Sequence, residues 1–294
     1  MPSGNDAVPW WFDALETIPG LVALGWIRFR HRSRLSSAGA PLLPPWNISF
    51  TSFATGVLCI LLSGMLAVAL ARGALAFFPV LTTDTTLAMI VNMGILHACF
   101  VGGAWTAAVV IRSAPDWLSD AASPPEASTA PSAPYPGSIW AAGLVTFLIT
   151  IGLVYPLGRL IQWAMLWRGI KIDTQVQITT LTKADSWGAV AVFSFFAIVM
   201  APIGEELIFR GGLFRFLRTR LPRWLALIVP ATVFALLHVD WETRAGISAL
   251  PSLTLLAVIF SVAYERTGKI AVPIIAHALF NLHTVTLVLL GVTG

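Results

Sequence analysis

Two adjacent carboxylates follow a long apolar run in the stretch APIGEELIFRGG, residues 201–212. On a helix, neighbouring residues point about 100° apart, whereas residues four apart share a face. Glu206 therefore faces Arg210, with the acid before the base, an order that stabilises a helical ion pair. Glu205 points to another side. We predict a structural Glu206–Arg210 pair and a reactive Glu205. The alternative is that both acids lie at a membrane interface beside the basic residues at 215–223.

Two later motifs also place polar side chains in apolar runs. FALLH (234–238) ends on His238, with Phe234 one helical turn earlier on the same face. HALFN (277–281) projects the His277 imidazole and the Asn281 carboxamide from one helix face. Taken alone, a histidine at the end of a span such as His238 is more often an interfacial or hydrogen-bonded residue than a catalyst. The alternative for the HALFN pair is a polar contact between helices.

Taken together, these groups have the chemistry of a hydrolase. A carboxylate and an imidazole can activate water as a general base when burial tunes their pKa values. A second imidazole and a carboxamide can donate hydrogen bonds to a developing oxyanion. Glu205, His238 and His277 could instead ligate zinc. The residues alone leave these two chemistries open.

The elements that must position these groups are membrane helices. The chain has 294 residues, of which 57% are hydrophobic and 11% are charged, whereas soluble domains carry about 25% charged residues. Besides the seven clear charge-poor windows given below, the segment 8–27 carries two acids and is either an interfacial helix or a further span. The sequence predicts an all-α, polytopic transmembrane helix bundle with seven to eight spans. The seven clear charge-poor windows are 50–71, 86–111, 138–158, 186–204, 224–239, 249–264 and 270–291.

Composition divides the chain into three parts. Residues 1–49 form an N-terminal amphipathic or spanning helix and a basic loop. Residues 50–172 hold the front helices and a Pro/Ser/Ala-rich linker at 119–138, which we expect to be disordered. Residues 173–294 form the back part, which contains all three polar motifs.

The distribution of charge predicts the orientation and the partners. Twelve of the 18 lysines and arginines fall on one side of the predicted spans, the side that we therefore expect to be cytoplasmic. This puts the Glu205 end of its helix toward the cytoplasm. No basic stripe interleaved with aromatic residues occurs, so we expect the lipid bilayer as a partner and no nucleic acid. Cys59 and Cys99 lie in apolar runs, which argues against a cysteine-based zinc cluster.

The three motifs resemble a known family. EELIFR (205–210), FALLH and HALFN are similar to the EExxxR, FxxxH and HxxxN motifs of the CPBP family, the CAAX prenyl protease and bacteriocin-processing family, also called Abi. The resemblance covers roughly residues 186–290. Three motifs in the right order, each in an apolar context, make it specific.

The resemblance implies an intramembrane endopeptidase in a bacterial inner membrane. It implies that Glu205 activates water with His238 as its partner, and that His277 and Asn281 stabilise the oxyanion. Glu206 and Arg210 would hold the first motif in shape, and Phe234 would pack beside the site. The substrate would be a membrane-associated peptide or protein, either CAAX-type and lipidated or bacteriocin-related. We expect no cofactor, with zinc as the alternative, and the chain has no HExxH motif.

Other polar residues and other functions carry less weight. We interpret His97 as a packed polar contact, His283 as a bystander that faces away from Asn281, and Asp240 as part of a solvated turn.

A non-catalytic immunity or scaffold protein of the same fold is one alternative function. A proton-relaying transporter is another, although the internal repeats typical of transporters are absent from the sequence.

Overall fold

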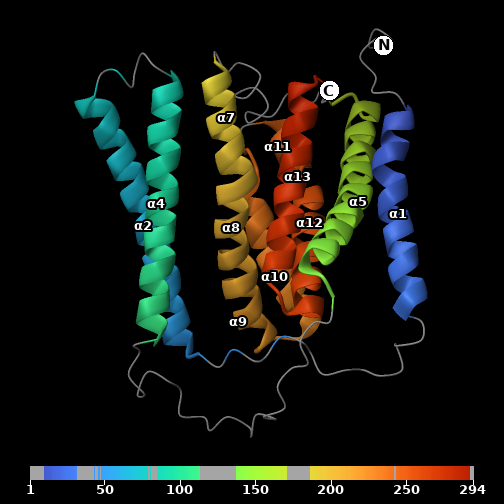
Figure 1. Cartoon of the computed structure of the whole chain (residues 1–294), viewed down its shortest axis with the longest axis horizontal. Coiled ribbons are helices and arrows are strands. Elements are labelled where there is room, and N and C mark those ends of the chain that lie inside the picture. The colour runs from blue at the N-terminus through green and yellow to red at the C-terminus, as the bar shows by residue number, and fades with distance from the viewer. Residues whose placement is uncertain are drawn as a thin grey trace, which may run out of the picture. The chain divides into compact units, whose positions relative to one another are not determined.

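The computed structural model of the chain describes residues 10–31, 43, 46, 48–78, 80, 85–112, 137–170, 186–241 and 243–291. Over these residues the chain is helical, and no strand occurs (Figure 1). The elements are α1 (Trp10–His31), α2 (Phe50–Phe77), α4 (Thr85–Arg112), α5 (Ile139–Trp167), α7 (Trp187–Phe195), η2 (Phe196–Met200), α8 (Ala201–Glu206), η3 (Leu207–Phe214), α9 (Arg215–Arg218), α10 (Arg223–His238), α11 (Arg244–Ser248), α12 (Leu250–Thr267) and α13 (Ala271–Leu289).

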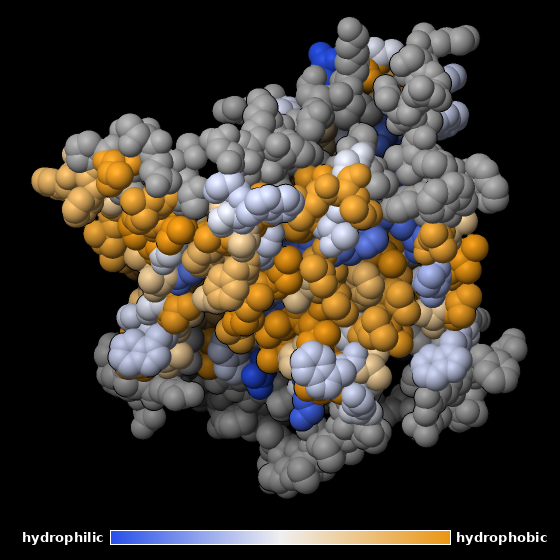
Figure 2. Space-filling model, turned by 45° about the horizontal axis from the view of Figure 1, so that its top comes forward, coloured by the Kyte–Doolittle hydropathy of each residue, from blue (hydrophilic) through white to orange (hydrophobic). Residues whose placement is uncertain are grey.

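All eight predicted apolar windows coincide with helices, and the predicted all-α polytopic fold is confirmed. Within the described residues, five helices are long and apolar enough to cross a membrane: Phe50–Phe77, Leu87–Val110, Ile139–Trp167, Trp187–Arg218 and Ala271–Leu289. Ala14–Trp26 and Arg223–His238 are shorter apolar helices. Figure 2 shows apolar residues over much of the helical surface in view. Many large apolar side chains are exposed, as expected where lipid rather than water is the solvent.

The contacts divide the helices into two units. The first unit consists of α1, α5, α10, α11, α12 and α13. In it, α5 packs against α1, α12 and α13, and α10 packs against α12. Small residues allow the closest approaches: a Cβ atom on Gly20 of α1 would lie 2.6 Å from the Cα atom of Gly152 in α5. Such glycine contacts are typical of helix pairs in membranes.

The second unit consists of α2, α4 and the continuous helix α7–η2–α8–η3–α9. Helix α4 packs against α2, α7 and α8. At the end of the long helix, Phe216 stacks on Phe53 with ring centroids 3.8 Å apart. The Arg220 guanidinium lies over the Phe216 ring and donates hydrogen bonds to the carbonyl groups of Trp46 and Ile48. These contacts tie the end of the long helix to the beginning of α2.

The long helix corrects one expectation. We expected the paired carboxylates at the end of a span over 186–204. The helix instead continues from Trp187 to Arg218, 32 residues, so Glu205 lies near its middle. The helix can continue through charged residues because Glu206 and Arg210 are buried together as an ion pair. We also expected the linker at 119–138 to be disordered. Residues 119–136 of this linker lie outside the described part of the chain, so that expectation stays a prediction.

Candidate active site

The two acids of the first motif end the six-residue segment α8, which lies between two π-helical segments, η2 and η3. A π-helix bonds residues five apart instead of four, and such segments are rare and frequent at functional sites. Gly211 and Gly212 lie in η3, and a Cβ atom at either position would make only ordinary contacts with backbone carbonyl oxygens, at 3.6 Å or more. The sequence gives no sign of this geometry, because hydropathy does not distinguish a π-helix from an α-helix.

The second acid of the motif is buried against an arginine. Nη1 of Arg210 donates to Oε1 of Glu206 at 2.8 Å, with the two side chains 1% and 0% exposed. The i, i+4 spacing predicts this pair, and the structure contains it. Breaking a buried ion pair leaves an uncompensated charge, so the pair secures the segment that carries Glu205. Glu205 itself is half-buried.

His238 lies at the end of α10, in the first unit. Its Nδ1 atom is 2.7 Å from the carbonyl oxygen of Phe234. A carbonyl oxygen only accepts hydrogen bonds, so Nδ1 carries the proton, and the neutral imidazole has its lone pair on Nε2. The His238 ring also stacks on the Phe234 ring, with centroids 4.1 Å apart. Backbone and ring together define both the tautomer and the orientation of this imidazole.

His277 comes to the same aromatic ring from another helix. It lies in α13, is buried, and its ring centroid is 6.2 Å from that of Phe234 and 5.3 Å from that of Phe260 in α12. Asn281 follows one turn later on α13 and is half-buried. The FxxxH and HxxxN motifs therefore meet around Phe234, which contacts both imidazoles.

The structure thus assembles two parts of the predicted site. Glu205, Glu206 and Arg210 belong to the second unit, and Phe234, His238, His277 and Asn281 belong to the first. The convergence of Glu205 with His238, His277 and Asn281 stays a prediction, and so do the catalytic roles of all seven residues.

Two residues set aside in the sequence have ordinary structural contacts. Nδ1 of His97 lies 2.8 Å from the carbonyl oxygen of Met93, and its ring packs on Phe196 at 4.6 Å. Asp240 accepts a hydrogen bond from the hydroxyl of Thr243, whose oxygen in turn caps the start of α11. Both interpretations, a packed contact and a turn residue, agree with these contacts.

His283, which we interpret as a bystander to the three motifs, has a polar partner elsewhere in the structure. Its Nε2 atom lies 3.1 Å from Oε1 of Glu16 in α1, in the first unit. The next residue, Thr284, forms a hydrogen bond with the Tyr155 hydroxyl of α5 at 2.9 Å. A signal was present in the sequence, because an acid inside the apolar helix over 8–27 needs a polar partner.

No group of three His, Cys, Asp or Glu side chains that could hold a metal ion occurs in the described part of the chain. The His238 tautomer is suited to either predicted chemistry, because a lone pair on Nε2 can accept a proton or bind zinc. The choice between them is therefore a matter for experiment.

Comparison with known proteins connects the back part of the chain to a protease family. The family model described as type II CAAX prenyl endopeptidase Rce1-like matches residues 187–283. The membrane-embedded CAAX protease MroQ of Staphylococcus aureus (strain USA300) is 37% identical over 100 residues, which are 31% of this chain and 37% of that protein. An uncharacterized 24.3 kDa protein of Escherichia coli is 26% identical over 115 residues, 38% of this chain and 52% of that protein.

These matches are partial. They span about a third of the Staphylococcus protein and about half of the Escherichia protein. No solved structure matches the chain. The matched region, 187–283, contains all three motifs that the sequence singled out.

Proposed function

We propose that this chain, whose residues 187–283 match the family model described as type II CAAX prenyl endopeptidase Rce1-like, is an intramembrane endopeptidase that uses water activated by Glu205 and His238. The observation that carries the proposal is the hydrogen bond from Nδ1 of His238 to the Phe234 carbonyl. This bond leaves the lone pair of the neutral ring on Nε2, which is what a general base or a water-orienting group requires.

Glu205 is proposed as the group that takes the proton from water. Its neighbour Glu206 is already committed to Arg210 in a buried ion pair, so the two acids differ in their surroundings. Glu205 is half-buried, and a positioned carboxylate can act as a general base. The flanking π-helical segments support a specialised role for this part of the helix.

His277 and Asn281 are proposed as donors to the oxyanion. Both side chains project from one face of α13, and His277 is held between the rings of Phe234 and Phe260. Preorganised donors in a site with little water stabilise developing negative charge more strongly than donors in bulk water. An imidazole N–H and a carboxamide N–H are both suitable donors for a tetrahedral intermediate.

In the proposed reaction the water oxygen attacks the peptide carbonyl carbon while Glu205 accepts one of its protons, and Nε2 of His238 accepts a hydrogen bond from the same water. The carbonyl oxygen becomes an oxyanion that accepts hydrogen bonds from His277 and Asn281. The proton then passes from Glu205 to the amide nitrogen as the C–N bond breaks. The products are a carboxylic acid and an amine, so atoms and charge balance.

The proposed substrate is a membrane-associated peptide or protein. The Staphylococcus relative is named a membrane-embedded CAAX protease, which supports a CAAX-type lipidated substrate. The resemblance of the motifs also allows a bacteriocin-related peptide. We further propose a bacterial inner membrane with the basic end of the Glu205 helix in the cytoplasm, on the basis of the uneven distribution of lysine and arginine.

The proposal is tested with the purified chain in liposomes and a set of membrane-associated peptides, with and without a prenylated CAAX end. Wild type should cleave at least one of them, and Glu205→Gln and His238→Ala should each lose the activity while remaining folded. Arg168→Gln, a change at an exposed residue at the end of α5, is the matched control and should cleave normally. Unchanged cleavage in both site variants would reject the assignment, and a folded wild type with no cleavage would favour the non-catalytic alternative.

A further inference from the structure

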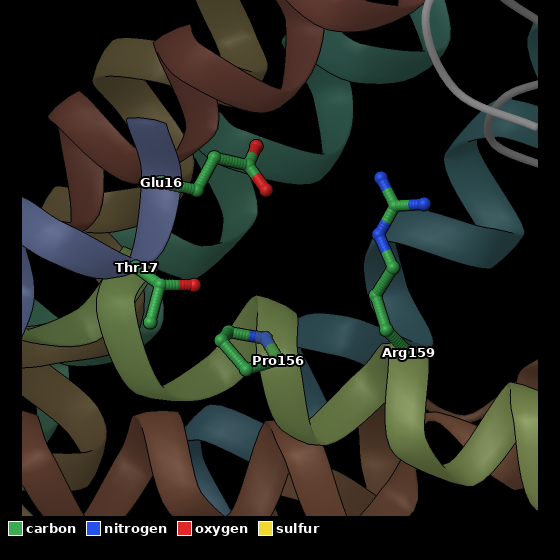
Figure 3. Close-up of a pocket in the computed structure, with 4 residues that line it drawn as sticks. All are labelled: Glu16, Thr17, Pro156 and Arg159. Carbon is green, nitrogen blue, oxygen red and sulfur yellow. The ribbon is translucent and has the colours of Figure 1, made fainter. Parts of the chain in front are cut away.

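The first unit contains a pocket that is separate from the three motifs. It has a volume of about 220 Å³ and is lined by Glu16 and Thr17 of α1 and by Pro156 and Arg159 of α5. Figure 3 shows the Glu16 carboxylate and the Arg159 guanidinium extending from the two helices toward the same space. A cavity of about 150 Å³ holds a molecule the size of benzene, so the pocket has room for a small polar group.

The pocket lies beside the closest approach of the two helices. Gly20 and Gly152 bring the backbones of α1 and α5 into direct contact. Glu16 lies one turn before Gly20, and Pro156 lies one turn after Gly152. Proline lacks a backbone N–H and disturbs the regular helix around it. The pocket therefore begins where the tight contact between the helices ends.

The pocket presents one charge of each sign. Glu16 is 4% exposed, and one of its oxygens accepts from Nε2 of His283 at 3.1 Å. A carboxylate has about four lone-pair sites on its two oxygens, so it has capacity for a second donor. Arg159 supplies donors on the other side of the pocket. The complementary ligand carries a cationic donor and an anionic acceptor close together.

The surroundings of the pocket are apolar and exposed. Leu15 and Ile18 on α1, and Leu160 and Trp163 on α5, are neighbours of the lining residues in the chain, and each is more than half exposed. In a chain with membrane-crossing helices, such side chains face acyl chains. Glu16 lies six residues after the start of α1 at Trp10, and Arg159 lies eight residues before the end of α5 at Trp167. The pocket therefore lies toward one end of both helices, on the side where lipid headgroups begin.

We propose that this pocket binds the headgroup of an ethanolamine phospholipid. The primary ammonium donates hydrogen bonds to Glu16, the phosphate accepts from Arg159 and from the Thr17 hydroxyl, and the acyl chains lie along Leu15 and Leu160. A choline headgroup has no N–H to donate to Glu16. A glycerol headgroup has no cation to place beside that carboxylate. The proposal rests on the pocket alone and not on the proposed protease activity.

The test uses the purified, delipidated full chain with dioleoyl phosphatidylethanolamine, phosphatidylcholine or phosphatidylglycerol. Bound lipid is counted by native mass spectrometry, and the Tm is measured with each lipid. Wild type should bind the ethanolamine lipid about tenfold more tightly than the other two. Arg159→Gln should weaken the binding of all three lipids, because each of them carries the phosphate that makes the charge-assisted contact. Arg168→Gln, which removes a charge from the same end of α5 outside the pocket, should bind the three lipids as wild type does.

Two further variants separate binding from folding. Glu16→Gln removes the ammonium acceptor but also weakens the contact with His283, so His283→Ala is measured beside it. We expect His283→Ala to lower the Tm and to keep the lipid preference, whereas Glu16→Gln loses the preference. Equal binding of all three lipids by wild type, or undiminished lipid binding by Arg159→Gln, would overturn the proposal.

Discussion

Nδ1 of His238 lies 2.7 Å from the carbonyl oxygen of Phe234, and the two rings stack with their centroids 4.1 Å apart. One residue thus defines both the tautomer and the orientation of the imidazole that we propose as part of the catalytic site. The same phenylalanine ring contacts His277 from α13. Phe234 is therefore a positioning residue for two imidazoles that come from different helices.

Replacing Phe234 by leucine should lower kcat much more than it changes KM. The backbone hydrogen bond to Nδ1 would remain, but both imidazoles would lose the ring that orients them, and misplacement by about 1 Å can cost on the order of 100-fold in rate. The measurement is steady-state peptide cleavage, with Tm as the check on folding. Phe216→Leu, at another buried and stacked phenylalanine, is the control. Equal losses of kcat in the two variants would argue against a positioning role.

Removing one member of the buried Glu206–Arg210 pair should lower the Tm of the chain. Arg210→Met leaves the Glu206 carboxylate buried and uncompensated, which typically costs about 3–5 kcal/mol. Glu206→Gln combined with Arg210→Met removes both charges and should recover part of the lost stability. Thermal unfolding in detergent measures both effects. A single variant as stable as wild type would show that the pair does not secure this segment.

Gly152→Ala should destabilise the first unit, although alanine is the better helix former. A Cβ atom at this position would lie 2.6 Å from the Cα atom of Gly20, so α1 and α5 would have to separate. Gly64→Ala in α2 is the matched control, because a Cβ there meets nothing within 4 Å, and it should be neutral or stabilising by about 1 kcal/mol. Similar Tm values for the two variants would contradict the close contact.

Removal of divalent metal should leave peptide cleavage intact, because the proposed water-activating group is Glu205. The measurement compares cleavage before and after dialysis against a zinc chelator, with the metal content determined for each sample. Loss of activity that added zinc restores would instead support the alternative in which Glu205, His238 and His277 bind the metal.

The predictions that the structure confirms came from local sequence patterns. Each of the predicted charge-poor windows coincides with a helix. The contacts Glu206–Arg210 and Phe234–His238 join residues four apart, so the helical repeat alone predicts them. The Glu16–His283 contact joins residues 267 positions apart, and no local pattern specifies such a pair. The end of the long helix at Arg218 was also missed, because hydropathy treats buried, paired charges as an interruption.

The central claim is that Glu205 and His238 act on the same water molecule, and a double-mutant cycle tests it most directly. Cleavage rates are measured for wild type, Glu205→Gln, His238→Gln and the double variant, each corrected for hydrolysis without enzyme. Residues that act as a unit are strongly non-additive, so the double variant should be about as slow as the slower single variant. Losses that multiply, or a single variant with the wild-type rate, would contradict the account.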